Sequence, residues 1–123
     1  MTHKLEKELL DAWKEYINHE LKKDDPVRIE FLYERACTKL CLNPSLWSEF
    51  VTWQKKMNSP NLIKTAKRAC RNCTWEASLW VAYLKVAEKK SPDDLEKIKD
   101  NALKALMGTA QVADIGQDQQ SVE

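Results

Sequence analysis

Apolar residues recur at three- and four-residue spacing along most of the chain, which is the spacing of one face of an α-helix. In the stretch 4–22 this apolar stripe is centred on Trp13, and Trp47 and Trp80 follow 34 and then 33 residues further on. An aromatic residue, a proline and an alanine follow each tryptophan in the same order. These residues are Tyr16, Phe50 and Tyr83; Pro26, Pro60 and Pro92; and Ala36, Ala69 and Ala102. A period in the low thirties predicts a helical repeat array, in which each unit buries its apolar face against its neighbours.

Each unit is predicted to contain two helices, because a capping residue and a proline interrupt the apolar stripe in its middle. The side chain of Asp, Asn or Ser can accept a hydrogen bond from a free backbone N–H of the first helical turn. Proline is tolerated at the first helical position because the N–H that it lacks would have no partner there. The pairs are Asp25–Pro26, Ser59–Pro60 and Ser91–Pro92 before the second helices, and Asn43–Pro44 before the first helix of unit two. Short connections require antiparallel neighbours. The expected fold class is all-α, a right-handed α-solenoid of about three antiparallel helix pairs. The pairs span about 4–37, 43–71 and 74–107.

The repeated aromatic residues and alanines are expected to form a structural core rather than a ligand cage. An alanine at a helix crossing lets the two backbones approach, and the tryptophan of the paired helix covers the remaining space. The expected core residues are Trp13, Tyr16, Tyr33, Ala36, Trp47, Phe50, Ala69, Trp80, Tyr83 and Ala102.

The apolar pattern fails after Leu106. Gly108 is predicted to end the last helix, and 108–123 is predicted to be a polar, disordered tail. No fourth tryptophan arrives, so the outer flank of the last pair is expected to be exposed and self-association is possible. The residues of that flank are Leu95, Ile98, Leu103 and Leu106. The chain is either a slice of a longer array or a short product whose tail folds back as a cap.

Composition fits a folded helical protein and gives no sign of a membrane partner. The chain of 123 residues is 43% apolar and 32% charged, with two glycines and a net charge of +1. This charge produces no strong field that would attract nucleic acid or a membrane surface. The apolar stretch 79–87 is too short to span a bilayer, and 1–8 lacks the apolar centre of a secretion signal. We therefore expect an intracellular protein.

Four cysteines allow two interpretations. Cys37 and Cys41, with Cys70 and Cys73, could be two half-sites for zinc. However, Cys37 and Cys70 directly follow the repeat alanines, so the repeat alone explains their spacing. We favour a packing role, with no metal, no cofactor and no disulfide.

Two motifs resemble the HAT (half-a-TPR) repeat family. They are Trp-x-x-Tyr in the first helix and Tyr33-Glu34-Arg35-Ala36 at the end of the second. An ordered series that includes Arg71-Asn72-Cys73-x-Trp75 resembles the N-terminal HAT region of spliceosome recycling factors. There are departures: Phe50 replaces the tyrosine of unit two, and Asp100–Asn101 replaces the Glu–Arg of unit three. The missing arginine puts a polar link of that repeat in doubt.

The resemblance implies a protein-interaction scaffold in the nucleus that assists reassembly of the U4/U6 small nuclear ribonucleoprotein during pre-mRNA splicing. Its implied partners are other spliceosomal proteins. The RNA-recognition motifs of such factors have no counterpart in this chain, so the resemblance implies RNA contact through other domains.

The sequence contains no catalytic constellation, and we expect no enzyme activity. There is no phosphate-binding glycine loop and no nucleophile motif, and His3 and His19 are the only histidines.

One stretch carries an unusual excess of positive charge. No acid occurs between Phe50 and Trp75, and the candidate partner-binding residues are Lys55, Lys56, Lys64, Lys67 and Arg71. A basic helix face could bind an acidic protein or, as the alternative function, RNA directly. It could equally be a solvated face that balances the acids of units one and three, and Arg68 could point inward.

Overall fold

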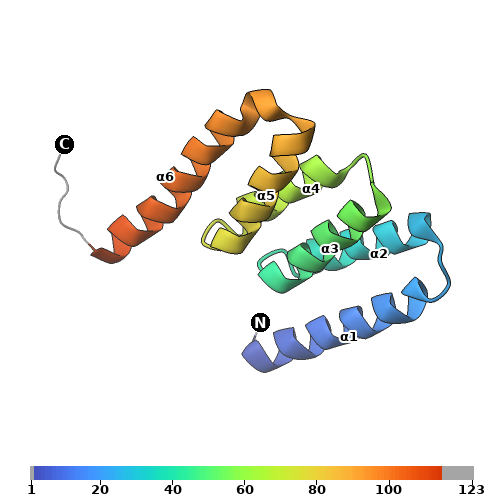
Figure 1. Cartoon of the computed structure of the whole chain (residues 1–123). Coiled ribbons are helices and arrows are strands. Elements are labelled where there is room, and N and C mark those ends of the chain that lie inside the picture. Colours follow the sequence, from blue (N-terminus) through green and yellow to red (C-terminus); the bar gives the residue numbers. More distant parts are fainter. Residues whose placement is uncertain (1, 115–123) are drawn as a thin grey trace.

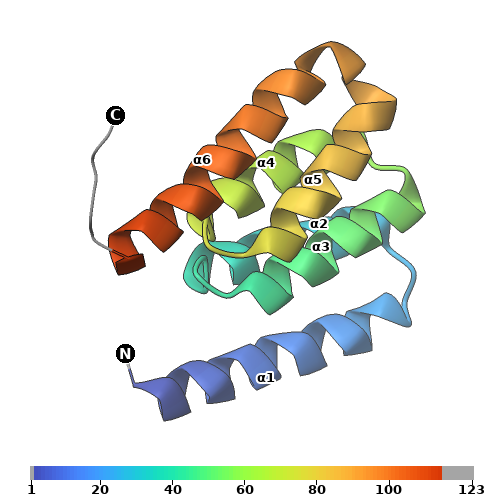
Figure 2. The same cartoon turned by 60° about the vertical axis from the view of Figure 1, so that its left-hand side comes forward.

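The computed structural model describes residues 2–114, and this part of the chain is helical with no strand (Figure 1). The helices are α1 (His3–Leu21), α2 (Pro26–Lys39), α3 (Pro44–Met57), α4 (Leu62–Asn72), α5 (Ala77–Lys90), the short 3-10 helix η1 (Pro92–Asp94) and α6 (Leu95–Asp114). Each α-helix packs against the next one in the sequence. In both views α1 and α6 lie at different edges of the stack (Figures 1 and 2). The predicted all-α solenoid of helix pairs is confirmed.

Two of the four predicted caps have the expected geometry. The side chain of Asp25 accepts from the Arg28 N–H at 3.3 Å, and Asn43 Oδ1 accepts from the Leu46 N–H at 3.1 Å. Proline occupies the start of α2 and of α3 in both cases. These two helix starts follow from local sequence alone.

The prediction for Ser59–Pro60 is wrong, and the prediction for Ser91–Pro92 is confirmed for the position of its proline but not for a hydrogen bond from the Ser91 side chain. Pro60 lies in a turn, and α4 begins at Leu62 after Asn61. Ser59 accepts from the Asn61 N–H at 3.1 Å instead of capping a helix. At the last pair, Pro92 begins η1, and α6 follows it from Leu95.

A contact between repeats explains the shape of the α3–α4 turn. The carboxylate of Glu30, on α2, accepts from Gln54 Nε2 at 3.2 Å, Ser59 Oγ at 3.4 Å and Asn61 Nδ2 at 2.7 Å. Asn58 adopts the left-handed conformation with φ 58° at the end of α3. Because Glu30 holds the Ser59 hydroxyl and the Asn61 amide, the turn closes on α2 and the helix starts later than its proline suggests.

The core runs along the whole array and contains most of the repeat residues. The buried members of the expected set are Tyr33, Ala36, Trp47, Phe50, Ala69, Trp80, Tyr83 and Ala102. Tyr33 stacks on Phe50 with ring centroids 5.1 Å apart, which packs one repeat against the next. The indole N–H of Trp47 donates to the Cys41 carbonyl at 2.7 Å, and that of Trp80 donates to the Thr74 carbonyl at 3.0 Å. Equivalent tryptophans thus make equivalent hydrogen bonds to the carbonyl six residues earlier.

Two expected core residues of the first repeat differ from this pattern. Tyr16 is 41% exposed, and Trp13 is only half-buried. The hydroxyl of Tyr16 accepts from the Arg28 guanidinium at 3.0 Å. The assignment of Tyr16 to the core is therefore wrong for the described structure, because its ring is partly exposed and its hydroxyl lies against a charged side chain of α2.

The last helix is longer than predicted. It continues through Gly108 to Asp114, so the predicted cap at Gly108 and the start of a tail there are wrong. Gly108 has no neighbouring heavy atom within 4 Å of the position a Cβ would take, and a helical glycine costs only about 1 kcal/mol. The remainder of the predicted tail, 115–123, lies outside the described residues.

The outer flank of the last pair is exposed only in part. Leu103 is 57% exposed, as expected, but Ile98 is buried, and Leu95 and Leu106 are half-buried. Ile98 and Ala102 face inward on α6, where α5 packs. The expectation is therefore wrong for Ile98 and right for Leu103.

Candidate functional site

The described residues hold no group of three or more His, Cys, Asp or Glu side chains placed to bind a metal ion. Cys37, Cys70 and Cys73 are buried and unpaired. Burial, with nearby negative groups, raises the pKa of Cys73 to about 11 and that of Cys70 to about 12. These buried thiols pack as small apolar side chains within the core. Within the described part of the chain, no helix is long and apolar enough to cross a membrane.

Three of the candidate cations lie together on the exposed side of α4. Lys64, Lys67 and Arg71 are all exposed, whereas Leu62 and Ala69 of the same helix are buried. At about 100° per residue, the three cations lie on the side of α4 directly opposite those buried residues. We call Lys64, Lys67 and Arg71 the α4 cation strip.

The α4 cation strip is electrostatically unpaired in the described structure. Among the side chains of residues 2–108, no ion pair involves Lys64, Lys67 or Arg71. Three cations at this spacing repel one another modestly, and an acidic surface or phosphate would relieve that repulsion.

Arg68 has a different role from the strip. Its guanidinium forms an ion pair with Glu34 at 2.8 Å and lies 5.2 Å from the centre of the Trp47 ring. Arg68 therefore joins α4 to α2 and covers the core tryptophan, so its inward orientation is confirmed.

Lys55 and Lys56 do not extend the α4 cation strip. Both are exposed in the last turn of α3, where cations interact favourably with the helix C-terminus. Lys56 lines a groove on the α1 side of α3, so it lies apart from the cations of α4, whereas Lys55 does not line that groove.

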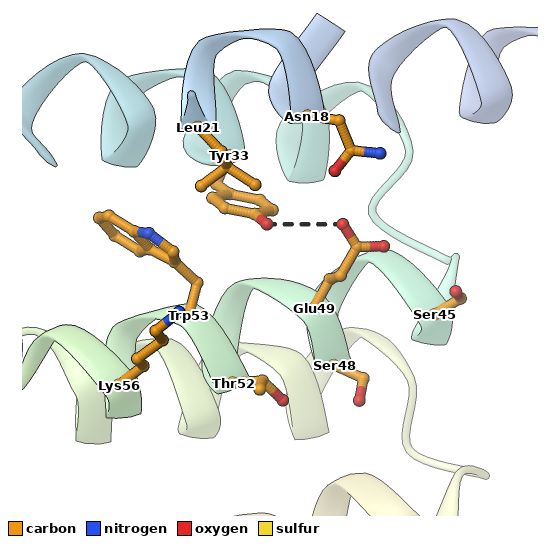
Figure 3. A pocket seen from close by; sticks show the side chains of 9 residues that line it. All are labelled: Asn18, Leu21, Tyr33, Ser45, Ser48, Glu49, Thr52, Trp53 and Lys56. Atoms are coloured by element: carbon orange, nitrogen blue, oxygen red, sulfur yellow. Dashed lines mark hydrogen bonds between the residues drawn. The ribbon is translucent and has the colours of Figure 1, made fainter. Parts of the chain in front are cut away.

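This groove lies between α1 and α3, with α2 beneath it (Figure 3). It is a shallow groove, open to solvent along most of its length, with a volume of about 560 Å³. Its lining residues are Asn18, Leu21, Tyr33, Ser45, Ser48, Glu49, Thr52, Trp53 and Lys56. We call it the α1–α3 groove.

The acidic group in the α1–α3 groove is already neutralised. Glu49 forms an ion pair with Lys14 at 3.2 Å. It also accepts from the Tyr33 hydroxyl at 3.4 Å, as Figure 3 shows. Lys14 also donates to the Ser45 hydroxyl at 2.6 Å. Burial and the nearby carboxylate raise the pKa of Tyr33 well above its ordinary value, so the phenol remains a hydrogen-bond donor. No ion pair among the side chains of residues 2–108 involves Lys56.

The sequence interpretation missed this groove, although a signal for it was present. Ser45, Ser48 and Thr52 follow one another at three- and four-residue spacing on α3, between the apolar positions. Such a row of small hydroxyl residues leaves space beside a helix that larger side chains would fill. Only the packing of α1 shows that this space becomes a groove.

Both surfaces lie in a part of the chain that matches a known protein family. A family model described as PRP39 C-terminal HAT repeat matches residues 1–79, more than half of the chain. The matched region includes α1 to α4, and therefore the α4 cation strip and the α1–α3 groove.

The chain is also similar to proteins named "Spliceosome associated factor 3, U4/U6 recycling protein". The Danio rerio protein is 36% identical over 99 residues, which are 79% of this chain and 10% of that protein. The Mus musculus protein is 36% identical over 101 residues, which cover 78% of this chain and 10% of that protein. The Homo sapiens protein is 37% identical over 87 residues, with 68% of this chain and 9% of that protein covered. The chain thus spans about a tenth of the length of these relatives.

Proposed function

The chain belongs to the HAT-repeat family, and from this premise we propose that it is a protein-interaction scaffold of pre-mRNA splicing. Its role is to hold spliceosomal proteins during reassembly of the U4/U6 small nuclear ribonucleoprotein, in the nucleus. The relatives named as U4/U6 recycling proteins support this assignment. The observation that carries a binding role is the α4 cation strip, exposed and without an ion-pair partner in the described structure.

An acidic protein surface is the partner that we propose for the α4 cation strip. Lys64, Lys67 and Arg71 repeat at helical spacing, so they fit carboxylates carried at the same spacing on a partner helix. Such contacts chiefly raise the association rate and select the partner, and they weaken as salt is added.

Capture from nuclear extract, with and without nuclease, tests the proposal. The protein is compared with K64E/K67E/R71E and with a matched control, K4E/K7E/K22E, which changes two exposed lysines of α1 and the exposed lysine that directly follows it. We expect spliceosomal proteins on the wild type and the control despite nuclease treatment, and a loss of most of them on the α4 variant. Equal capture by all three proteins would contradict a role for the strip.

Circular dichroism serves as the folding control for this experiment. Because the three α4 side chains are exposed and lie opposite the core, the variant should keep its helicity. A collapse of helicity would show that the cations are structural, and the strip proposal would fail with it.

Direct RNA binding by the same strip is the second candidate function, favoured by the same unpaired cations. If three phosphates bind, the logarithm of the affinity for a single-stranded oligonucleotide should fall against the logarithm of salt concentration with a slope of about −2. Loss of capture after nuclease treatment, together with this slope, would favour RNA over a protein partner. Indifference to a plain oligonucleotide would exclude the RNA candidate.

A further inference from the structure

We propose that the α1–α3 groove is a second, independent binding site, which takes an extended acidic peptide segment of a partner protein. The inference rests on the proposed scaffold function but concerns a different surface from the α4 cation strip. Four observations support it: the length of the groove, its apolar floor, its unpaired polar rim and its charge.

The length of the groove fits a short extended peptide. Its lining on α3 extends from Ser45 to Lys56, which at about 1.5 Å per residue is roughly 16 Å of helix. An extended chain advances about 3.3 Å per residue, so about five peptide residues fit along it.

The floor of the groove is apolar and already ordered. Trp53 is 8% exposed and packs beside Tyr33, with ring centroids 5.8 Å apart. Leu21 of α1 lies on the other side of the floor (Figure 3). One aliphatic peptide side chain seated between Leu21 and Trp53 would bury apolar surface without reorganising the core.

The rim of the groove offers hydrogen-bonding groups that no protein atom occupies. Asn18, Ser48 and Thr52 are exposed, and their side chains make no hydrogen bond to another side chain or backbone group of residues 2–108. An amide and two hydroxyls can each donate and accept, which is what an extended peptide backbone requires.

The charge of the groove selects an acidic peptide. Glu49 is neutralised by Lys14 and by the Tyr33 hydroxyl, which leaves Lys56 as the unpaired charge among the lining residues. A carboxylate side chain near the end of the peptide can therefore bind Lys56. A nucleic acid fits less well, because several phosphates would meet a single unpaired cation and a carboxylate.

Selection from a random linear library of peptides about seven residues long, displayed on phage, tests this site. We expect enriched peptides that carry an aliphatic residue close to an aspartate or glutamate. K56E should weaken the binding of these peptides about tenfold, and a new selection on K56E should favour lysine or arginine in place of the acid. K55E is the matched control, since Lys55 is the neighbouring exposed lysine of α3 but does not line the groove.

A second variant tests occupation of the groove independently of charge. Ser48→Tyr puts a bulky uncharged side chain at an exposed position in the middle of the groove, and it should reduce peptide binding about tenfold while helicity is unchanged. No enriched peptide, equal effects of K56E and K55E, or undiminished binding by the Ser48 variant would overturn the proposal. The α4 variant should bind the selected peptides normally, so failure of the groove and failure of the scaffold proposal are distinguishable.

Discussion

The first and the middle helix pair carry the same repeat motif, but they bury it to very different extents. Phe50 is 0% exposed and Tyr16, its equivalent, is 41% exposed. Trp47 is 1% exposed, whereas Trp13 is half-buried. Phe50 stacks on Tyr33 of the preceding pair, and no preceding pair covers Tyr16 in the described structure.

This difference shows that the repeat motif supplies an apolar surface and that the neighbouring repeat supplies the burial. Both sites carry the tryptophan and the aromatic residue three positions later, so these motif residues by themselves do not account for the contrast. A solenoid is held together by interfaces between adjacent units. The contribution of a repeat residue to the free energy of unfolding should therefore depend on its position in the array.

The largest expected effect is the loss of the middle tryptophan. We expect Trp47→Ala to lower the free energy of unfolding by about 3–5 kcal/mol, because it opens a cavity in the core and leaves the Cys41 carbonyl without its indole donor. Trp13→Ala should cost roughly half as much, because Trp13 is already partly in water. Denaturant titration of both variants checks this, and equal losses would contradict the dependence on neighbours.

The contact at Glu30 should have the next largest effect. We expect Glu30→Ala to lower the free energy of unfolding by about 1–3 kcal/mol, since the buried Gln54 and Ser59 side chains lose their acceptor. Glu88→Ala is a suitable control, because Glu88 is exposed and has no ion pair in the described structure. Thermal denaturation of the two variants measures the difference, and equal midpoints would show that Glu30 does not stabilise the turn.

Amide hydrogen exchange should reveal the same contrast at the other end of the array. Residues 92–106 pack mainly on α5, whereas α3 and α4 have helices on both sides. We expect their amides to exchange faster than those of the middle pair. Equal exchange rates in all three pairs would show that local stability does not depend on whether a pair has helices packed on both sides.

The smallest expected effect is a pH dependence that originates in the first pair. Burial alone would raise the pKa of Glu20, but the hydrogen bond from Arg28 and the charges of Lys23 and Arg28 outweigh it, so the pKa lies below its ordinary value. The stability that Glu20 contributes is complete above its unfolded pKa of about 4.3 and is lost as pH falls through the lower folded pKa.

Thermal midpoints measured between neutral and acid pH check this prediction. Glu20→Gln should lose less stability below about pH 4 than the wild type does. Glu15→Gln, at an exposed position of the same helix, should follow the wild type. Identical acid profiles of wild type and the Glu20 variant would show that the contacts of Glu20 with Arg28 and Lys23 do not contribute.

Much of the fold could be predicted from sequence because it depends on local and periodic signals. The spacing of Trp47 and Trp80 predicted the pairs, and Asp25 and Asn43 predicted two helix starts. The start of α4 could not be predicted in this way, because Glu30 controls it from the preceding repeat. The burial of Tyr16 also depends on a neighbour that its own sequence does not describe.

The candidate site was predictable only in part, for a related reason. The spacing of Lys64, Lys67 and Arg71 within one helix was sufficient to place them on one face. Lys56 is close to them in the sequence, but it lies on α3 and lines the α1–α3 groove. The α1–α3 groove is formed by two helices separated in the sequence, so periodicity within either one does not reveal it.

The ion pair between Glu34 and Arg68 has a mechanical consequence. It joins the second helices of adjacent repeats, α2 and α4, at 2.8 Å. One period further along the chain, Lys67 and Asn101 stand at the equivalent positions, and no ion pair joins α4 to α6 among the side chains of residues 2–108. The two joints between repeats are therefore held differently: the first combines the packing of α2 on α3 with an ion pair, and the second relies on the packing of α4 on α5. Added salt should loosen the first joint and leave the second unchanged, because salt screens an ion pair whose side chains are partly exposed.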